Sequence, residues 1–155
     1  MISRTPESLE KAKNYCFLLL KFRPRSEYEI RERLKRKKFG EPVIKAVLTF
    51  LKEKSFIDDE AFTQAWVDFR LKKSFGLRRI TQELRIKGIS KDIVAQVLEK
   101  TKENYSEREV VAKITRERLN RLKEIEPQTA KRRLFAYLLR RGFSSEAIID
   151  ALEQL

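Results

Sequence analysis

Three consecutive acids, Asp58, Asp59 and Glu60, are the residues of this sequence that most resemble a catalytic cluster. Grouped carboxylates hold divalent cations in two-metal nucleases and phosphoryl-transfer enzymes. Such a site needs further oxygen ligands, and no second carboxylate cluster in the sequence supplies them. The acids directly precede an amphipathic segment, where Asp58 or Asp59 would cap a helix and complement its positive end. We therefore predict that this cluster begins a helix and binds no metal.

The remaining side chains leave little room for catalysis. The 155 residues include no His and one Cys, Cys16. This composition excludes Ser-His-Asp and Cys-His mechanisms, His-bearing zinc sites and an internal disulfide. Cys16 opens an apolar run and is predicted to be a core thiol. Because no nucleophile, base and orienting group come together, we predict no catalytic residues, no metal and no cofactor, and therefore no enzyme.

The charge of the chain points to a polyanionic partner. The formal net charge is +13 and the pI is near 10.0, so the protein should be drawn to nucleic acid, an anionic membrane or an acidic protein surface. The excess is distributed as +6 in residues 1–59, +4 in 60–105 and +3 in 106–155. No basic-then-apolar leader opens the chain, and no apolar run approaches about 18 residues. We expect a soluble, cytoplasmic protein with no membrane role.

An internal repeat organises the elements. Residues 30–48 align with 80–98 at an offset of 50, and 134–152 follow at a further offset of 54, with apolar residues at matching places. Each copy is predicted to be two helices that meet at a tight corner. Gly88 and Gly142 occupy the left-handed position that ends the first of these helices. Lys38 takes that position in the first copy, which leaves the geometry of that corner open.

A further amphipathic helix precedes each pair. The first is predicted from Pro6 to Lys21 with Thr5 as cap, the second from Asp59 to Lys72, and the third after Ser106. In the second helix, the spacing of Phe62, Ala65, Trp66 and Phe69 favours burial over base stacking. The predicted fold class is all-α, with three tandem three-helix repeats at residues 1–57, 58–104 and 105–155.

Capping residues and ion pairs are also predicted. Capping boxes are expected at Ser26–Glu29 and Ser106–Glu109, and Ser90 and Ser144 are plausible caps for the last helices of the second and third copies. Three i,i+4 pairs, Glu27–Arg31, Glu29–Arg33 and Glu32–Arg36, are typical of a solvated helix face.

Basic residues concentrate at helix joints, in stretches 11–26, 69–82 and 127–145 that contain no acid. Arg78 and Arg79 lie near the positive end of a helix, where a cation is unfavourable, so we expect them to hold a phosphate or carboxylate together with free backbone amides. The basic residues 35–38 lie at the end of a predicted helix, where cations stabilise the helix dipole, so they could serve the fold as well as bind a ligand. The predicted contact residues are Lys21, Arg23, Arg25, Lys35, Lys37, Lys38, Arg70, Lys72, Lys73, Arg78, Arg79, Arg85, Lys131, Arg132, Arg133, Arg140 and Arg141.

Residues 55–90 resemble the RecX regulatory proteins of bacteria. The family pattern runs from an Asp-Asp element through an Ala-Phe helix to Gly-x-x-Arg-Ile-x-x-Glu-Leu-x-x-Lys-Gly-Ile. Two departures are Ser55 and Lys38, where the family commonly has Gly. The matching residues are Ile57, Asp58, Asp59, Phe62, Arg70, Gly76, Arg79, Ile80, Glu83, Leu84, Lys87, Gly88 and Ile89.

The resemblance implies an elongated, curved array of three-helix repeats that is not an enzyme. It implies binding in the groove of the RecA recombinase filament on DNA, with modulation, expected to be inhibition, of ATP hydrolysis, strand exchange and co-protease activity. The implied partners are the RecA filament and the phosphate backbone of single- and double-stranded DNA, and the protein is expected to be a monomer.

Two other classes remain open at this stage. The first is a sequence-nonspecific nucleic-acid-binding helical protein with no dedicated protein partner, since three-helix units with a tight corner resemble helix-turn-helix domains. No copy offers an obvious base-reading face, so such a protein would contact the backbone. The second is a helical scaffold for an acidic protein, which naked DNA would not displace.

Overall fold

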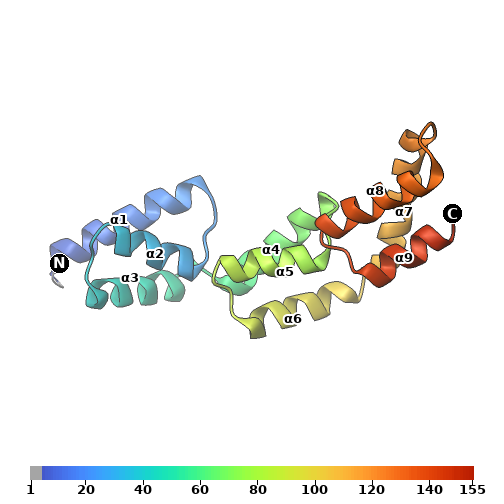
Figure 1. Cartoon of the computed structure of the whole chain (residues 1–155). Coiled ribbons are helices and arrows are strands. Elements are labelled where there is room, and N and C mark those ends of the chain that lie inside the picture. Colours follow the sequence, from blue (N-terminus) through green and yellow to red (C-terminus); the bar gives the residue numbers. More distant parts are fainter. Residues whose placement is uncertain (1–4) are drawn as a thin grey trace. The chain divides into compact units, whose positions relative to one another are not determined.

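The computed structural model of this chain describes residues 5–155, which form nine α-helices and one short 3-10 helix and contain no β-strand. The all-α class and the three tandem groups of three helices are confirmed. The elements, labelled in Figure 1, are α1 Pro6–Phe22, α2 Glu27–Arg36, α3 Glu41–Glu53, α4 Asp59–Lys72, α5 Leu77–Ile86, α6 Lys91–Lys102, α7 Glu107–Leu119, η1 Asn120–Leu122, α8 Pro127–Arg140 and α9 Ser145–Glu153.

Side-chain caps begin most of these helices, as predicted. Thr5 and Ser8 form a reciprocal capping box at α1. The hydroxyl groups of Ser26, Ser90, Ser106 and Ser144 each accept a hydrogen bond from the backbone N–H three residues later. An N-terminal cap satisfies an amide that has no partner within its own helix.

The capping box predicted at Ser26 is only half formed. The return hydrogen bond, from the N–H of Ser26 to the side chain of Glu29, is absent, so this part of the prediction is wrong. The Glu29 carboxylate pairs with Arg23 at 2.8 Å and with Lys87 at 3.2 Å instead of returning to the cap. The predicted i,i+4 pairs of α2 are wrong for a related reason. Glu27 pairs with Lys52 of α3, and Glu32 pairs with Lys35 one turn away. Glu27 and Glu29 therefore pair with residues outside α2, and Glu32 pairs within the helix at a different spacing.

The tight corner has the same geometry in all three copies. Lys38, Gly88 and Gly142 have φ values of 69°, 75° and 98°, in the left-handed region. In each copy the next residue donates its N–H to the carbonyl group five residues back, at 3.1–3.2 Å. The first corner is therefore formed by a lysine in a conformation that glycine adopts at lower cost.

Replacing Lys38 with glycine is expected to stabilise the first unit described below. The substitution removes left-handed strain of about 1 kcal/mol, partly offset by the greater freedom of glycine in the unfolded chain. The rate at which Ellman's reagent modifies the buried thiol of Cys16 in mild urea should fall by up to about fivefold. Lys37→Gly is the control, because Lys37 has φ −80° and gains no relief. An equal change in both variants would contradict the prediction.

The chain divides into two compact units, and the first comprises residues 5–65 and 84–94 of the described chain. In this unit α3 packs against both α1 and α2. Cys16 is fully buried, which confirms the predicted core thiol, and burial raises its pKa to about 12. The core consists of Ala12, Cys16, Leu19, Ile30, Leu34, Val43, Ile44, Val47, Leu48, Leu51 and Ile57.

The second unit comprises residues 66–83 and 95–155, and in it α7, α8 and α9 pack against one another. Its largest core cluster consists of Val111, Ile114, Leu134, Leu138, Phe143, Ala147, Ile148, Ala151 and Leu152. The residues of the third repeat that the alignment predicts to be apolar core, from Leu134 to Leu152, are all buried. The predicted repeat boundaries after residues 57 and 104 stay predictions. No helix in residues 5–155 is long and apolar enough to cross a membrane.

Candidate nucleic-acid interface

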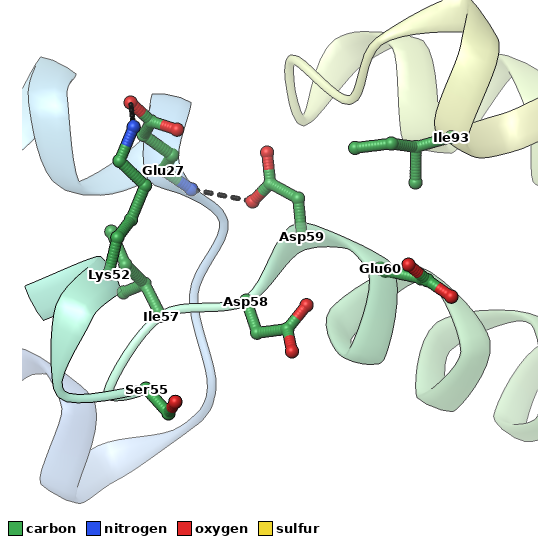
Figure 2. A pocket seen from close by; sticks show the side chains of 8 residues that line it. All are labelled: Glu27, Lys52, Ser55, Ile57, Asp58, Asp59, Glu60 and Ile93. Carbon is green, nitrogen blue, oxygen red and sulfur yellow. Dashed lines mark hydrogen bonds and ion pairs between the residues drawn. The ribbon is translucent and has the colours of Figure 1, made fainter.

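The acidic cluster begins helices, as predicted, but it caps two of them. Asp58 accepts a hydrogen bond from the N–H of Ala61 at 3.1 Å and caps α4. Asp59 instead accepts from the N–H of Glu27, the first residue of α2, at 2.9 Å. Figure 2 shows the carboxylates of Asp58, Asp59 and Glu60 pointing in different directions around a hollow of the first unit. Across residues 5–155, no group of three or more potential ligands is placed to hold a metal ion.

The surroundings of this hollow disfavour the charged form of Asp59. Burial, with the nearby carboxylates of Glu27 and Asp58, raises the pKa of Asp59, whereas the Glu27 amide and Lys52 oppose the shift. Lys52 pairs with Glu27 at 3.2 Å and is the one cation lining the hollow (Figure 2). Asp58 and Asp59 are therefore held by helix amides, and the single lysine pairs with Glu27, in keeping with a structural role.

The predicted basic residues of the α1–α2 joint lie in different surroundings. Lys21 is exposed. Arg23 is paired with Glu29 at 2.8 Å. Arg25 is partly buried, and its Nε has no hydrogen-bond partner among the described residues. Burial and the neighbouring Arg23 and Arg33 lower the pKa of Arg25. An underpartnered guanidinium beside two others favours an anionic ligand at this joint.

At the end of α2 the three predicted cations are exposed. Lys35 forms an i,i+3 pair with Glu32, and the ammonium group of Lys37 lies 5.2 Å from the centre of the Tyr15 ring. Lys38 is the left-handed corner residue and has no ion-pair partner within the described chain. Arg85, near the end of α5, is also exposed.

In the second unit, several predicted contact residues are engaged in the fold. Arg70 forms a two-pronged ion pair with Glu83, at 2.6 and 2.9 Å, and its guanidinium lies 3.6 Å from the centre of the Phe75 ring. Arg79 pairs with the same Glu83 and donates a hydrogen bond to the carbonyl of Arg140 at 3.2 Å.

Arg141 is held against the same ring. Its guanidinium lies 3.7 Å from the centre of Phe75 and donates hydrogen bonds to the carbonyl groups of Ser74 and Lys73. Arg70, Arg79 and Arg141 thus join the α4–α5 joint to the α8–α9 corner. These contacts give the three arginines a structural role, and a direct contact with a ligand stays a prediction for them.

The backbone at the start of α5 corrects one expectation. The N–H of Gly76 donates to the carbonyl of Arg141 at 2.7 Å, and the N–H of Arg78 donates to that of Gly142 at 3.2 Å. These amides are satisfied within the unit, so they are not free to hold a phosphate at this helix end.

All but one of the other predicted cations of the second unit are exposed. Lys72, Arg78, Arg133 and Arg140 form no ion pair within residues 5–155, and Lys131 is half-buried. Lys73 lies 5.7 Å from the Phe69 ring, and Arg132 donates to the hydroxyl of Thr129 at 3.1 Å. Lys72 and Arg78 flank residues 73–77, so the α4–α5 joint carries unpaired positive charge on both sides.

The buried face of α4 differs from the prediction. Phe62 and Val67 are buried, but Phe69 is 50% exposed and Ala65 is exposed. The indole N–H of Trp66 donates to Glu83 at 3.0 Å, which places a polar partner beside a half-buried ring. The prediction that the whole aromatic stripe is buried is therefore wrong at Phe69, which lies within reach of solvent next to Lys73.

Three-helix units in tandem, with cations exposed at the helix joints, define a helical repeat protein. Family models described as the first, second and third three-helix domains of RecX match residues 12–51, 58–98 and 106–152, respectively. The chain belongs to the RecX family.

Similar proteins cover most of the chain. Regulatory protein RecX of Amycolatopsis mediterranei is 35% identical over 139 residues, which are 88% of this chain and 78% of that protein. Regulatory protein RecX of Haemophilus influenzae is 31% identical over 142 residues, or 91% of this chain and 92% of the relative.

Solved structures support the fold. The crystal structure of RecX from Lactobacillus salivarius has a TM-score of 0.83 at 20% identity, and the match covers 97% of this chain and 98% of that one. A second crystal structure of regulatory protein RecX has a TM-score of 0.79 at 22% identity, and covers 96% of this chain and 74% of the other.

Proposed function

We propose that this protein binds the RecA–DNA nucleoprotein filament in its groove and inhibits the filament's ATPase, strand-exchange and co-protease activities. The observation that carries the proposal is the match of three successive domains to the RecX family, whose similar members are named regulatory proteins. We further propose that it acts as a monomer in the cytoplasm and has no catalytic activity of its own.

The electrostatics are consistent with such a partner. A filament on DNA presents phosphate groups and acidic protein side chains, and a chain of net charge +13 is attracted to both. Among the predicted contact residues, Lys72, Arg78, Arg133 and Arg140 have no ion-pair partner to give up within the described chain, so binding through them costs no internal ion pair. We propose these four as the leading contacts of the second unit.

Inhibition follows if binding differs between filament states. A ligand shifts an equilibrium only by its difference in affinity for the two states. A protein that contacts neighbouring recombinase subunits stabilises the filament state that its surface fits and lowers the population of the others. In this mechanism the residues of the protein supply charge and shape but take no part in ATP hydrolysis.

The test is ATP hydrolysis by RecA filaments on excess single-stranded DNA, with this protein at well below one copy per recombinase. Binding to naked DNA is measured in the same buffer. We expect hydrolysis to fall clearly at this low ratio, because one bound protein affects several subunits. Unchanged hydrolysis alongside salt-sensitive DNA binding would contradict the proposal and favour a nonspecific nucleic-acid-binding protein.

A further inference from the structure

A groove in the second unit combines an apolar floor with a positively charged rim. Its volume is about 340 Å³, at the lower end of the range for ligand pockets. Leu122, Leu134, Ala136 and Tyr137 form the floor. The rim consists of Arg118, near the end of α7, and of Arg133 and Arg140, two turns apart on α8.

The rim lacks compensating acids. Arg118, Arg133 and Arg140 form no ion pair within residues 5–155, and residues 127–145, which include all of α8, contain no Asp or Glu. Three arginine side chains thus line one apolar groove with no acid among the lining residues to balance them. The occupant should therefore offer both negative charge and an apolar group.

The groove suits a protein segment better than a nucleobase. The guanidinium of Arg118 lies 3.5 Å from the centre of the Tyr137 ring, so that face of the ring is already covered and cannot stack on a base. Carboxylates accept only, and Arg binds them through two parallel hydrogen bonds. Arg and Tyr are also enriched at protein–protein interfaces.

We propose that this groove binds an extended acidic segment of a protein partner, with an apolar side chain on the floor and carboxylates on the rim. Arg133 and Arg140 are separated by seven residues of one helix, or about 10 Å along its axis. An extended peptide covers that distance in about three residues. The segment should thus carry acids three positions apart with Leu or Phe between them. The inference rests on the proposed function in that it assigns a protein contact to the third domain.

The probe is the fluorescein-labelled peptide Gly-Ser-Asp-Glu-Leu-Phe-Glu-Asp-Ser-Gly, and its binding to the full chain is measured by fluorescence anisotropy. A second peptide has Ser in place of Leu and Phe, and a third probe is a labelled ten-nucleotide oligo(dT). We expect the first peptide to bind at least tenfold more tightly than the second. Equal affinity of the two peptides, or no binding of the first at 1 mM, would overturn the proposal.

Two variants locate the binding in the groove. Ala136→Leu fills the floor without changing the charge, and Arg133→Glu with Arg140→Glu reverses the rim. Each should weaken binding of the first peptide at least tenfold. Lys113→Glu with Arg116→Glu is the charge-matched control, because both residues are exposed on α7 and form no ion pair within the described chain. Circular dichroism confirms that each variant is folded.

The outcomes separate this inference from the proposed function. If the control reversal weakens the peptide as much as the rim reversal does, the effect is one of net charge and the groove is not the site. If Ala136→Leu weakens oligo(dT) but spares the peptide, the groove binds nucleic acid and the proposal is wrong. Neither result contradicts the proposed inhibition of the filament, because that activity is measured in a separate assay without the peptide.

Discussion

Replacing Gly76 with alanine is expected to lower the free energy of unfolding of the second unit by about 3 kcal/mol. A Cβ atom at position 76 would lie 2.3 Å from the carbonyl oxygen of Gly142 and 2.6 Å from the amide nitrogen of Phe143. Both are backbone atoms, so no side-chain rotation can relieve the overlap. The hydrogen bond from the Gly76 N–H to the Arg141 carbonyl holds the two segments at this separation.

Trp66 provides the measurement, since it is the only tryptophan and belongs to the second unit. Urea unfolding followed by its fluorescence should show a much lower midpoint for Gly76→Ala. Ser74→Gly is a matched control in the same joint, because Ser74 has φ 62° and glycine would relieve that strain. The control should gain about 1 kcal/mol at most. If the urea midpoint shifted in the same direction in both variants, the predicted steric overlap at position 76 would be contradicted.

Local chemistry made much of the fold predictable. Ser90, Ser106 and Ser144 cap their helices because a hydroxyl group before an amphipathic run satisfies an orphan amide wherever the helix lies. The buried residues of the repeats follow from apolar spacing for the same reason. The sequence does not predict the geometry of the corner at Lys38, because a lysine gives no signal for positive φ, although it occupies the place of Gly88.

Contacts between distant segments could not be predicted in the same way. The sequence predicts ligand contacts at Arg70 and Arg79, because an acid-free basic stretch gives no sign of Glu83 as a partner. Arg141 meets the carbonyl group of Ser74 across 67 positions of sequence. The amide of Gly76 is likewise occupied by a residue far along the chain. No periodicity or propensity encodes such pairings, since they depend on tertiary packing.

The candidate groove illustrates the same limit. Arg133 and Arg140 were predicted contact residues, but Arg118 and Tyr137 were not. A heptad spacing of arginines on α8 is visible in the sequence, whereas the guanidinium of Arg118 reaches the Tyr137 ring from a different helix. The absence of acids from α8 is the one feature of the sequence that indicates this groove. Its apolar floor depends on the packing of α7, η1 and α8 against one another.

Reversing Lys72 and Arg78 to glutamate is expected to abolish most binding to DNA and to the recombinase filament while leaving the fold intact. Both side chains are exposed and form no ion pair within the described residues, so reversal leaves no carboxylate without its cation. Arg79→Glu is unsuitable, because it would place a carboxylate opposite the largely buried Glu83. The amides of Gly76 and Arg78 are satisfied internally, so neither can replace the lost cations as a donor to the ligand.

The measurement is the salt dependence of binding to single-stranded DNA, together with inhibition of filament ATP hydrolysis. If Lys72 and Arg78 each neutralise one phosphate, the slope of log K against log salt should decrease in magnitude by about 1.4. The protein concentration needed for half-inhibition should rise at least tenfold. Urea unfolding monitored by Trp66 should be close to that of the unmodified protein, because surface substitutions typically change stability by within about 0.5 kcal/mol.

Net charge alone must be separated from location. The double reversal changes the formal charge from +13 to +9, since each substitution subtracts two charges. Lys113→Glu with Arg116→Glu produces the same +9 on α7, outside the predicted contact residues. If the α4–α5 joint contacts the polyanion, this control should weaken binding only through the long-range field and leave the salt slope nearly unchanged. Equal losses in slope and in inhibition would mean that the protein binds through diffuse charge and that the joint is no site.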